Sequence, residues 1–236
     1  KLNQKKKSKF FNFINKKLNN KVNVSIFLGW NNLKIARIVA KKNNIIDEKF
    51  LISKKIFFPL QEVIIVVTKG KVLVKNVSKN FLLSKFDALN FLIKKNKSFR
   101  LKILQNSEFF IISSKNKKRD TLTTSKFNFK TDIKSRNLWG GQCISRPYEG
   151  KSITLVLFDL KKGFKFNDKG HKNEQITWLI NGKMKFYAQN KTKTLKKGFG
   201  IDIGSKHPHG GVSNGAIGFD AFYPKREEQK YKRLNS

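Results

Sequence analysis

All three histidines of this chain lie within residues 163–226, beside turns rich in glycine and proline. His171 stands alone, whereas His207 and His209 flank Pro208. Neutral imidazole is the commonest protein ligand of transition metals and titrates close to neutral pH. Histidines scattered by chance over 236 residues would rarely all fall in one quarter of the chain. The residue types therefore predict that the chemistry of this protein lies here and involves a metal.

Strands are expected to position these side chains. Short runs rich in Ile, Val, Phe and Leu recur along the whole chain between Asn, Gly, Lys and Ser turns. Such runs at intervals of about 8 to 12 residues, with little helical periodicity, are typical of all-β sandwiches and barrels. The sequence therefore predicts an all-β fold. The expected strands include Val22–Leu28, Leu33–Ala40, Ile64–Thr68, Val72–Val77, Phe109–Ser113, Ile153–Asp159, Ile176–Ile180 and Met184–Ala188.

A sequence repeat divides the chain into two similar halves. Gln61–Val72 matches Asn173–Met184 at a constant offset of 112 positions, each with a glycine between two strands. Residues 85–87 fall opposite residues 197–199 at the same offset. This pattern predicts two copies of one barrel. The expected divisions are a basic N-terminal arm (1–20), an N-terminal barrel (21–114), a linker (115–135) and a C-terminal barrel with the metal site (136–236).

The composition limits the class of protein. A chain of 236 residues with 39% hydrophobic residues and 22 phenylalanines has enough apolar surface to fold. Cys143 is the single cysteine, so no internal disulfide is possible and a reducing compartment is expected. No run of about 18 apolar residues occurs, so we predict no membrane span. A cytoplasmic location is the simplest expectation.

The formal net charge of +37 raises the possibility of polyanion binding, because neutralised phosphates release counterions. Lysine accounts for nearly all of this charge, whereas arginine is the better reader of phosphates and bases. The lysines are also spread along the chain among Asn, Ile and Phe, as a drifting base composition would produce. We therefore expect no specific nucleic-acid partner, and keep polyanion binding as the least favoured alternative. Attraction of a small anionic substrate is expected in either case.

The first 20 residues are basic, with Phe10, Phe11, Phe13, Ile14 and Leu18 at roughly helical spacing. One interpretation is an amphipathic segment that contacts a membrane surface or an acidic partner. The other is a helix or an extended arm that packs on the domain. The second interpretation is preferred.

Residue spacing in the second half resembles the two motifs of the cupin superfamily. Gly163 is followed after five residues by 169–171, after three more by Gln175, and after six more by Gly182. This matches the first cupin motif, and Pro208-His209 with its preceding glycines matches the second. The resemblance implies a jelly-roll barrel for this half. With the repeat, it implies an all-β fold of two tandem jelly-roll (cupin) barrels.

The metal ligands of cupins occupy four positions of these motifs, which here are Lys169, His171, Gln175 and His209. An ammonium group has no lone pair to donate, so Lys169 departs from the family pattern. The resemblance thus implies a divalent transition metal (Mn, Fe, Ni or Zn) held by His171, Gln175 and His209, with no carboxylate among the ligands. Glu174 is expected on the opposite strand face. The corresponding N-terminal positions cannot ligate a metal, so that barrel is expected to be a scaffold or homodimer surface; they are Phe57, Pro59, Val63 and Lys97.

Within the cupins, residues 171–176 and 220–226 resemble the uronate-linearising cupin of pectin catabolism and the bicupin isomerase of bacilysin biosynthesis. The resemblance implies catalysis by Asp220 and Arg226, with substrate contacts from Lys169, Phe222 and Arg226. The expected reaction is isomerisation or ring opening of a small anionic uronic or keto acid. The alternative is a non-catalytic ligand-binding bicupin with an impaired metal site. Three other roles are expected: His207 shapes a turn, Trp178 is core, and Trp139–Gly141 with Cys143 forms a linking loop.

Overall fold

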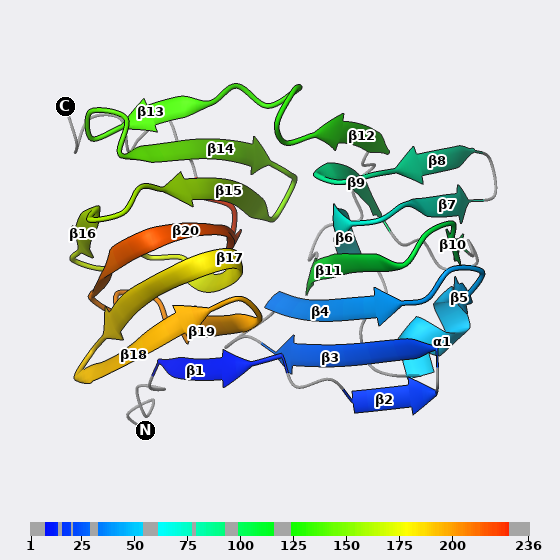
Figure 1. Cartoon of the computed structure of the whole chain (residues 1–236), viewed down its shortest axis with the longest axis horizontal. Helices are drawn as coiled ribbons and strands as arrows, with labels where there is room; N and C mark the ends of the chain where they lie inside the picture. Colours follow the sequence, from blue (N-terminus) through cyan, green and yellow to red (C-terminus); the bar gives the residue numbers. More distant parts are fainter. Residues whose placement is uncertain are drawn as a thin grey trace. The chain divides into compact units, whose positions relative to one another are not determined.

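The computed structural model describes residues 8–13, 16–19, 21–28, 33–53, 61–76, 79–92, 99–115 and 124–226 (Figure 1). These residues form an almost entirely β structure, with α1 (Glu48–Ser53) as the one helix among them. The prediction of an all-β chain is confirmed. In these ranges no helix combines the length and apolar character that membrane crossing requires. The chain divides into two compact units, with the main boundary between Ile133 and Lys134.

The C-terminal unit is built on a sheet of nine strands. The sheet follows the order β1-β19-β17-β20-β15-β14-β13, with β16 paired to β20 and β18 paired to β17. Long antiparallel strands β17 and β20 form its centre. The strands are β1 (Lys9–Asn12), β13 (Arg136–Leu138), β14 (Cys143–Glu149), β15 (Thr154–Leu160), β16 (Lys165–Asp168), β17 (Glu174–Ala188), β18 (Lys191–Lys196), β19 (Phe199–Ile203) and β20 (His209–Tyr223).

The N-terminal unit contains two sheets. A seven-stranded sheet follows the order β12-β9-β6-β11-β4-β3-β2, and a four-stranded sheet follows β5-β10-β7-β8. The strands are β2 (Lys16–Asn19), β3 (Val22–Leu28), β4 (Leu33–Ala40), β5 (Ile45–Asp47), β6 (Gln61–Lys69), β7 (Val72–Asn76), β8 (Asn80–Leu83), β9 (Asp87–Leu92), β10 (Phe99–Ile103), β11 (Ser107–Lys115) and β12 (Ser125–Asn128).

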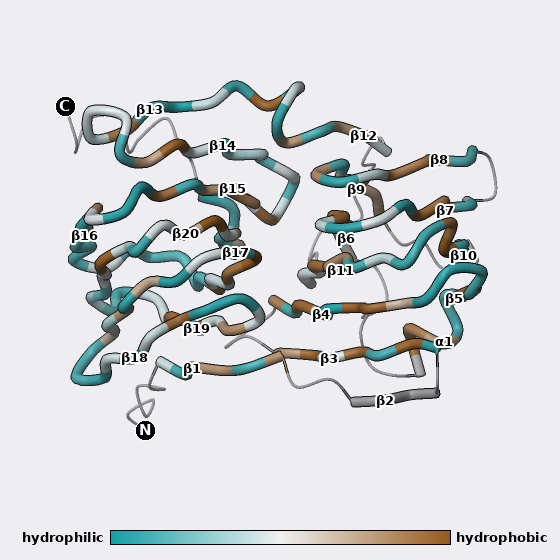
Figure 2. Tube along the Cα trace, in the orientation of Figure 1, coloured by the Kyte–Doolittle hydropathy of each residue, from teal (hydrophilic) through white to brown (hydrophobic). Residues whose placement is uncertain are grey.

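The hydrophobic runs of the sequence become the central strands of each unit. β3 and β4 begin and end at the predicted residues. Figure 2 shows long hydrophobic segments along both, and Ile35 and Ile38 of β4 are fully buried. The separately predicted strands 176–180 and 184–188 are parts of the single strand β17, because the chain passes through Gly182 without leaving the sheet. Trp178 is fully buried, which confirms its prediction as a core residue.

The sequence repeat is also a repeat of strand pairing. β6 pairs with β9 in the register in which β17 pairs with β19, at the same offset of 112. β7 likewise pairs with β8 in the register in which the second half of β17 pairs with β18. Both units therefore share one local topology. Equivalent pairs are Val63–Phe91 and Gln175–Ile203, Ile65–Leu89 and Thr177–Ile201, and Val72–Leu83 and Met184–Leu195.

The turns that precede β9 and β19 are equivalent as well. The Phe86 N–H donates to the Val67 carbonyl at 2.7 Å, and the Gly198 N–H donates to the Leu179 carbonyl at 3.1 Å. Both donors have positive φ, 68° for Phe86 and 81° for Gly198. Residues 112 positions apart thus form equivalent hydrogen bonds and adopt similar backbone conformations.

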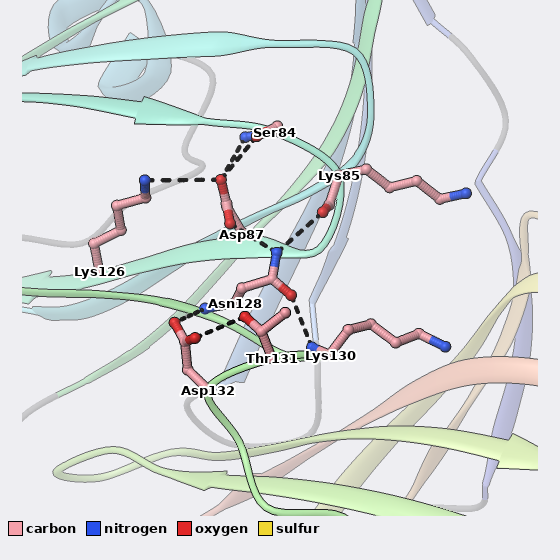
Figure 3. Close-up of polar contacts among 8 residues, drawn as sticks. All are labelled: Ser84, Lys85, Asp87, Lys126, Asn128, Lys130, Thr131 and Asp132. Carbon is pink, nitrogen blue, oxygen red and sulfur yellow. Dashed lines mark hydrogen bonds and ion pairs between the residues drawn. The ribbon is translucent and has the colours of Figure 1, made fainter.

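A polar network fixes β12 to the turn between β8 and β9 (Figure 3). Asp87 Oδ2 accepts hydrogen bonds from the backbone N and the hydroxyl of Ser84 at 2.8 and 3.0 Å. Asp87 Oδ1 accepts a hydrogen bond from Asn128 Nδ2 at 2.8 Å, and Lys126 Nζ lies 3.9 Å from Oδ2. The buried carboxylate is thereby satisfied, as a buried charge must be. Residues of the segment predicted as a linker, 115–135, therefore include a strand of the N-terminal unit.

The segment predicted as a basic arm, 1–20, contains two short strands where the structure describes it. Residues 9–12 of β1 pair with β19 in the C-terminal unit. Residues 16–19 of β2 pair with β3 in the N-terminal unit. The helical spacing of the phenylalanines does not produce a helix in these two stretches, since backbone pairing at sheet edges takes its place.

Candidate metal centre

The two motif histidines lie on the wall of a cavity of about 660 Å³ in the C-terminal unit. This volume is within the range of about 300–1,000 Å³ found for small-molecule sites. The wall combines ionisable and polar groups with aromatic and aliphatic side chains. The polar groups are Arg136, Ser145, Asn167, Asp168, Lys169, His171, Gln175, Thr177, His209, Asp220 and Arg226.

His209 begins β20 and is held by the backbone beside it. Its Nδ1 lies 2.9 Å from the carbonyl oxygen of His207. A carbonyl only accepts, so Nδ1 carries the proton and Nε2 presents a lone pair. The ring stacks on Phe186, with centroids 6.1 Å apart and an interplanar angle of 7°. A ring nitrogen oriented by a backbone carbonyl is the usual arrangement behind a metal-binding imidazole. His207 supplies this carbonyl from the turn before Pro208.

Asp168 is the carboxylate that the sequence interpretation missed. It ends β16 directly opposite His209 of β20 in the antiparallel register. Ligand atoms of Asp168, His171 and His209 all lie within 4.8 Å of one another. The sequence interpretation expected no carboxylate here, whereas the structure places one beside the two histidines. Strand alternation could have indicated that Asp168 faces the cavity. Phe166 and Asp168 share one face of β16, and Phe166 packs against Phe186 in the cavity wall.

The turn between Asp168 and His171 depends on Gly170. This glycine has φ of 100°, and a Cβ at this position would overlap the backbone of Lys206. Its N–H donates to Asp168 Oδ1 at 2.7 Å. Any side chain here would push the two chain segments apart. Gly170 thus allows the chain to return His171 toward the carboxylate three residues earlier.

His171 is buried and forms a hydrogen bond with Gln175. Its Nε2 lies 2.8 Å from Gln175 Oε1, and its buried Nδ1 has no hydrogen-bond partner among the described residues. Gln175 Nε2 donates to Thr177 Oγ1 at 2.8 Å and to Asp220 Oδ1 at 3.1 Å. Because the amide nitrogen is used in this way, Oε1 is the acceptor and His171 Nε2 carries the proton. Glu174 does not line the cavity, as expected from strand alternation.

Both imidazoles are kept neutral by their surroundings. Burial, followed by the charge of Arg226, lowers the pKa of His171 to about 4. Burial is also the largest cause of the lowered pKa of His209. A neutral imidazole is the form that binds metals. The two rings lie edge to face with centroids 5.4 Å apart.

This set of donors fits a divalent transition metal. Two neutral imidazoles and one carboxylate are a recurrent set for such ions. The buried Nδ1 of His171 has no hydrogen-bond partner among the described residues, and Nε2 of His209 presents a lone pair. Gln175 lies beside the three residues and offers an amide oxygen. The sequence-predicted ligands His171, Gln175 and His209 are therefore brought together, with Asp168 added.

Cationic groups line the same cavity. The guanidinium carbon of Arg226 lies 4.9 Å from the centroid of the Phe222 ring, and this ring packs edge-on against His171 at 5.5 Å. Arg226 is anchored through its backbone, whose N–H donates to Thr154 Oγ1 at 2.9 Å. Lys169 is exposed but belongs to the cavity wall. Four sequence-predicted residues, Lys169, Asp220, Phe222 and Arg226, thus lie around one space.

Trp139 and Cys143 also line this cavity, which the prediction of a simple linking loop did not include. Residues 139–142 form the turn between β13 and β14. Trp139 packs against Phe164 with centroids 5.1 Å apart. Burial, then Asp220 and Asp159, raises the pKa of the Cys143 thiol to about 12, which makes it a poor nucleophile.

The N-terminal equivalents of the ligand positions are described only in part. Val63, which corresponds to Gln175, is fully buried in the hydrophobic core of its unit. Phe57, Pro59 and Lys97 lie outside the described residues.

No model of a protein family matches this sequence, and no curated protein matches it. Its fold, however, is similar to many solved structures. A cupin 2 conserved barrel domain protein from Leptotrichia buccalis superposes with a TM-score of 0.63 and 17% identity, covering 94% of this chain and 99% of that one. Oxalate decarboxylase from Lactobacillus farciminis gives 0.71 and 11%, covering 96% and 90%. Oxalate decarboxylase from Bacillus subtilis, described with Mn(II) centres, gives 0.66 and 10%, covering 92% and 77%.

These similarities assign the chain to the cupin fold. At such low identity they carry the fold alone. They identify no family and no particular enzyme.

Proposed function

We propose that this protein is a metal-dependent bicupin of two tandem jelly-roll barrels that acts on a small anionic uronic or keto acid by isomerisation or ring opening. The observation that carries the proposal is the convergence of Asp168, His171 and His209 on a cavity also lined by Arg226. Asp168, His171 and His209, with Gln175 beside them, would hold the metal. The metal identity is proposed as Mn, Fe, Ni or Zn. When bound, it would act as a Lewis acid on a substrate carbonyl or hydroxyl.

The remaining residues are proposed to bind the substrate and move a proton. Arg226 binds the carboxylate with its planar pair of N–H groups, and Lys169 adds a second positive charge at the cavity. The Phe222 ring packs against the guanidinium and limits the access of water to His171. Asp220 takes a proton from a carbon of the substrate and returns it to an oxygen, or the reverse. The N-terminal barrel serves as a scaffold or as the surface of a homodimer, in a cytoplasmic protein.

Metal analysis of the purified protein tests this proposal. The protein is washed with chelator, reloaded separately with manganese, iron, nickel and zinc, and analysed for bound metal. We expect near one equivalent in the wild type and little in His209→Ala. His207→Ala is the matched control, because it removes an imidazole two positions away and keeps the backbone carbonyl that orients His209.

Substrate screening follows if metal is retained. Uronates and keto acids are incubated with the loaded protein, and the His209→Ala variant sets the background. A protein that binds no metal under any of these conditions contradicts the proposal. Lys169 at the first histidine position of the motif would then favour the second candidate, a ligand-binding bicupin without catalysis.

A further inference from the structure

Gln175 and Thr177, which are buried, and Asp220, which is partly buried, occupy positions whose counterparts in the N-terminal unit carry apolar side chains. Gln175 and Thr177 of β17 correspond to Val63 and Ile65 of β6 at the offset of the repeat. Asp220 lies opposite Thr177, as Ile111 lies opposite Ile65. The N-terminal residues belong to a hydrophobic core cluster. The same strand pairing therefore forms in the N-terminal unit without polar side chains at these positions. The three apolar counterparts are Val63, Ile65 and Ile111.

The polar residues are joined in a directed chain of hydrogen bonds. Thr177 Oγ1 donates its only proton to Asp220 Oδ1 at 2.6 Å. The same hydroxyl oxygen accepts from Gln175 Nε2 at 2.8 Å, and that nitrogen also donates to Asp220 Oδ1 at 3.1 Å. A carboxylate only accepts hydrogen bonds, so Asp220 fixes which atom donates in each bond of this chain. Gln175 is thereby left with one orientation, in which Oε1 faces His171.

We propose that Thr177, held by Asp220, is a positioning residue that keeps the amide oxygen of Gln175 toward the metal-binding histidines. A glutamine amide is nearly symmetric in shape, and its flipped form would present NH₂ to the site. Two N–H groups would repel a cation and offer it no lone pair. Thr177 and Asp220 together disfavour that form, because the Asp220 carboxylate has no proton to donate to Oε1 and the Thr177 hydroxyl already donates its proton to Asp220. The inference rests on the proposed metal-dependent function.

Metal affinity of a graded set of variants tests this role. Mn²⁺ binding is measured by calorimetry for the wild type, Thr177→Ser, Thr177→Val and the double variant Thr177→Val/Asp220→Asn. Outer-shell partners of metal ligands typically contribute about 10–100-fold in affinity. We expect Thr177→Ser to bind within about twofold of wild type, Thr177→Val about tenfold more weakly, and the double variant about 100-fold more weakly.

Thr68→Val is the matched control, since its hydroxyl donates to the Glu108 carbonyl in the N-terminal unit. It should leave Mn²⁺ affinity unchanged. Circular dichroism checks that each variant is folded, which the apolar N-terminal counterparts lead us to expect. Wild-type affinity in a folded double variant would overturn the proposal.

Ring ¹⁵N shifts of the metal-free protein separate this inference from the proposed function. Wild-type His171 should carry its proton on Nε2, and the double variant should lose that preference because the Gln175 amide is free to flip. If the wild type binds no metal, the proposed function fails, and these shifts alone decide the positioning role. A retained Nε2–H preference in the double variant would overturn it.

Discussion

Asp168 lies directly opposite His209 across the antiparallel pairing of β16 and β20. The pairing places a carboxylate beside an imidazole whose Nδ1 is already occupied by a backbone carbonyl. His171 follows three residues after Asp168, through a turn that only glycine fits. One cross-strand register and one short turn are thus sufficient to assemble a set of three donors.

Asp168→Asn should weaken metal binding at least about tenfold, because a ligand charge contributes more than an outer-shell partner. Asparagine retains an oxygen that accepts from the Gly170 N–H, so the turn is preserved. Calorimetric titration with Mn²⁺ measures the change. Lys165→Ala, an exposed change on the same strand, is the control and should have no effect. Equal affinity in Asp168→Asn and wild type would remove Asp168 from the ligand set.

Lys169→His should strengthen metal binding roughly tenfold, since it replaces a cation by a neutral donor at the cavity wall. Lys172→His is the control, because it places the same imidazole at an exposed position that does not line the cavity. The affinities are compared by competition with a chromogenic chelator. An unchanged affinity would mean that residue 169 points away from the metal centre.

The metal-free protein should lose stability in mild acid because of His171. Burial and Arg226 lower its pKa to about 4, against 6.5 for an ordinary histidine. Between these values the unfolded chain binds more protons, so the free energy of unfolding falls as the pH drops from about 6.5 toward 4. The change is about 1.4 kcal/mol for each pKa unit. Urea denaturation in chelator at several pH values should show a flatter profile for His171→Gln.

Arg226→Gln should raise the pKa of His171. Burial lowers this pKa most, and the guanidinium charge lowers it further by opposing the imidazolium. Removing that charge leaves the burial effect and makes protonation easier. Titration of the histidine ring protons by nuclear magnetic resonance measures the shift. Lys225→Gln removes an exposed neighbouring charge and should change it less.

Cys143 should resist thiol reagents in the folded protein. Burial and two carboxylates raise its pKa to about 12, so little thiolate exists at pH 8. Reaction with a disulfide reagent should be at least about 100-fold slower in the native protein than in urea. Rapid labelling of folded protein would contradict the position of Cys143 within the cavity wall.

The sequence allowed the prediction of His171, Gln175 and His209, because their spacing along the chain is itself the signal. Asp168 escaped prediction because its role depends on which residue of β20 it faces. Cross-strand register between residues 41 positions apart is set by the packing of the whole sheet.

Trp139 escaped prediction for a related reason. Its glycine-rich surroundings indicated a connection, and the residues do form a turn. Whether a turn closes over a cavity or points to solvent is decided by the strands that it joins. The repeat, by contrast, could be predicted from the sequence, because equal strand registers in the two units produce equal residue spacing.

The bend of β20 brings residues from its two ends to the same cavity. His209 and Asp220 are eleven residues apart on this one strand, and a straight strand would separate them by roughly 36 Å. Both nevertheless line the same cavity. The β17–β20 pair has register shifts on either side of Asn181 and Gly182, and irregularities of this kind bend the strands that contain them. The separation between His209, a proposed metal ligand, and Asp220, the proposed proton-transfer residue, therefore depends on the bend of β20, and a substitution at the bend would change that separation without contacting either residue.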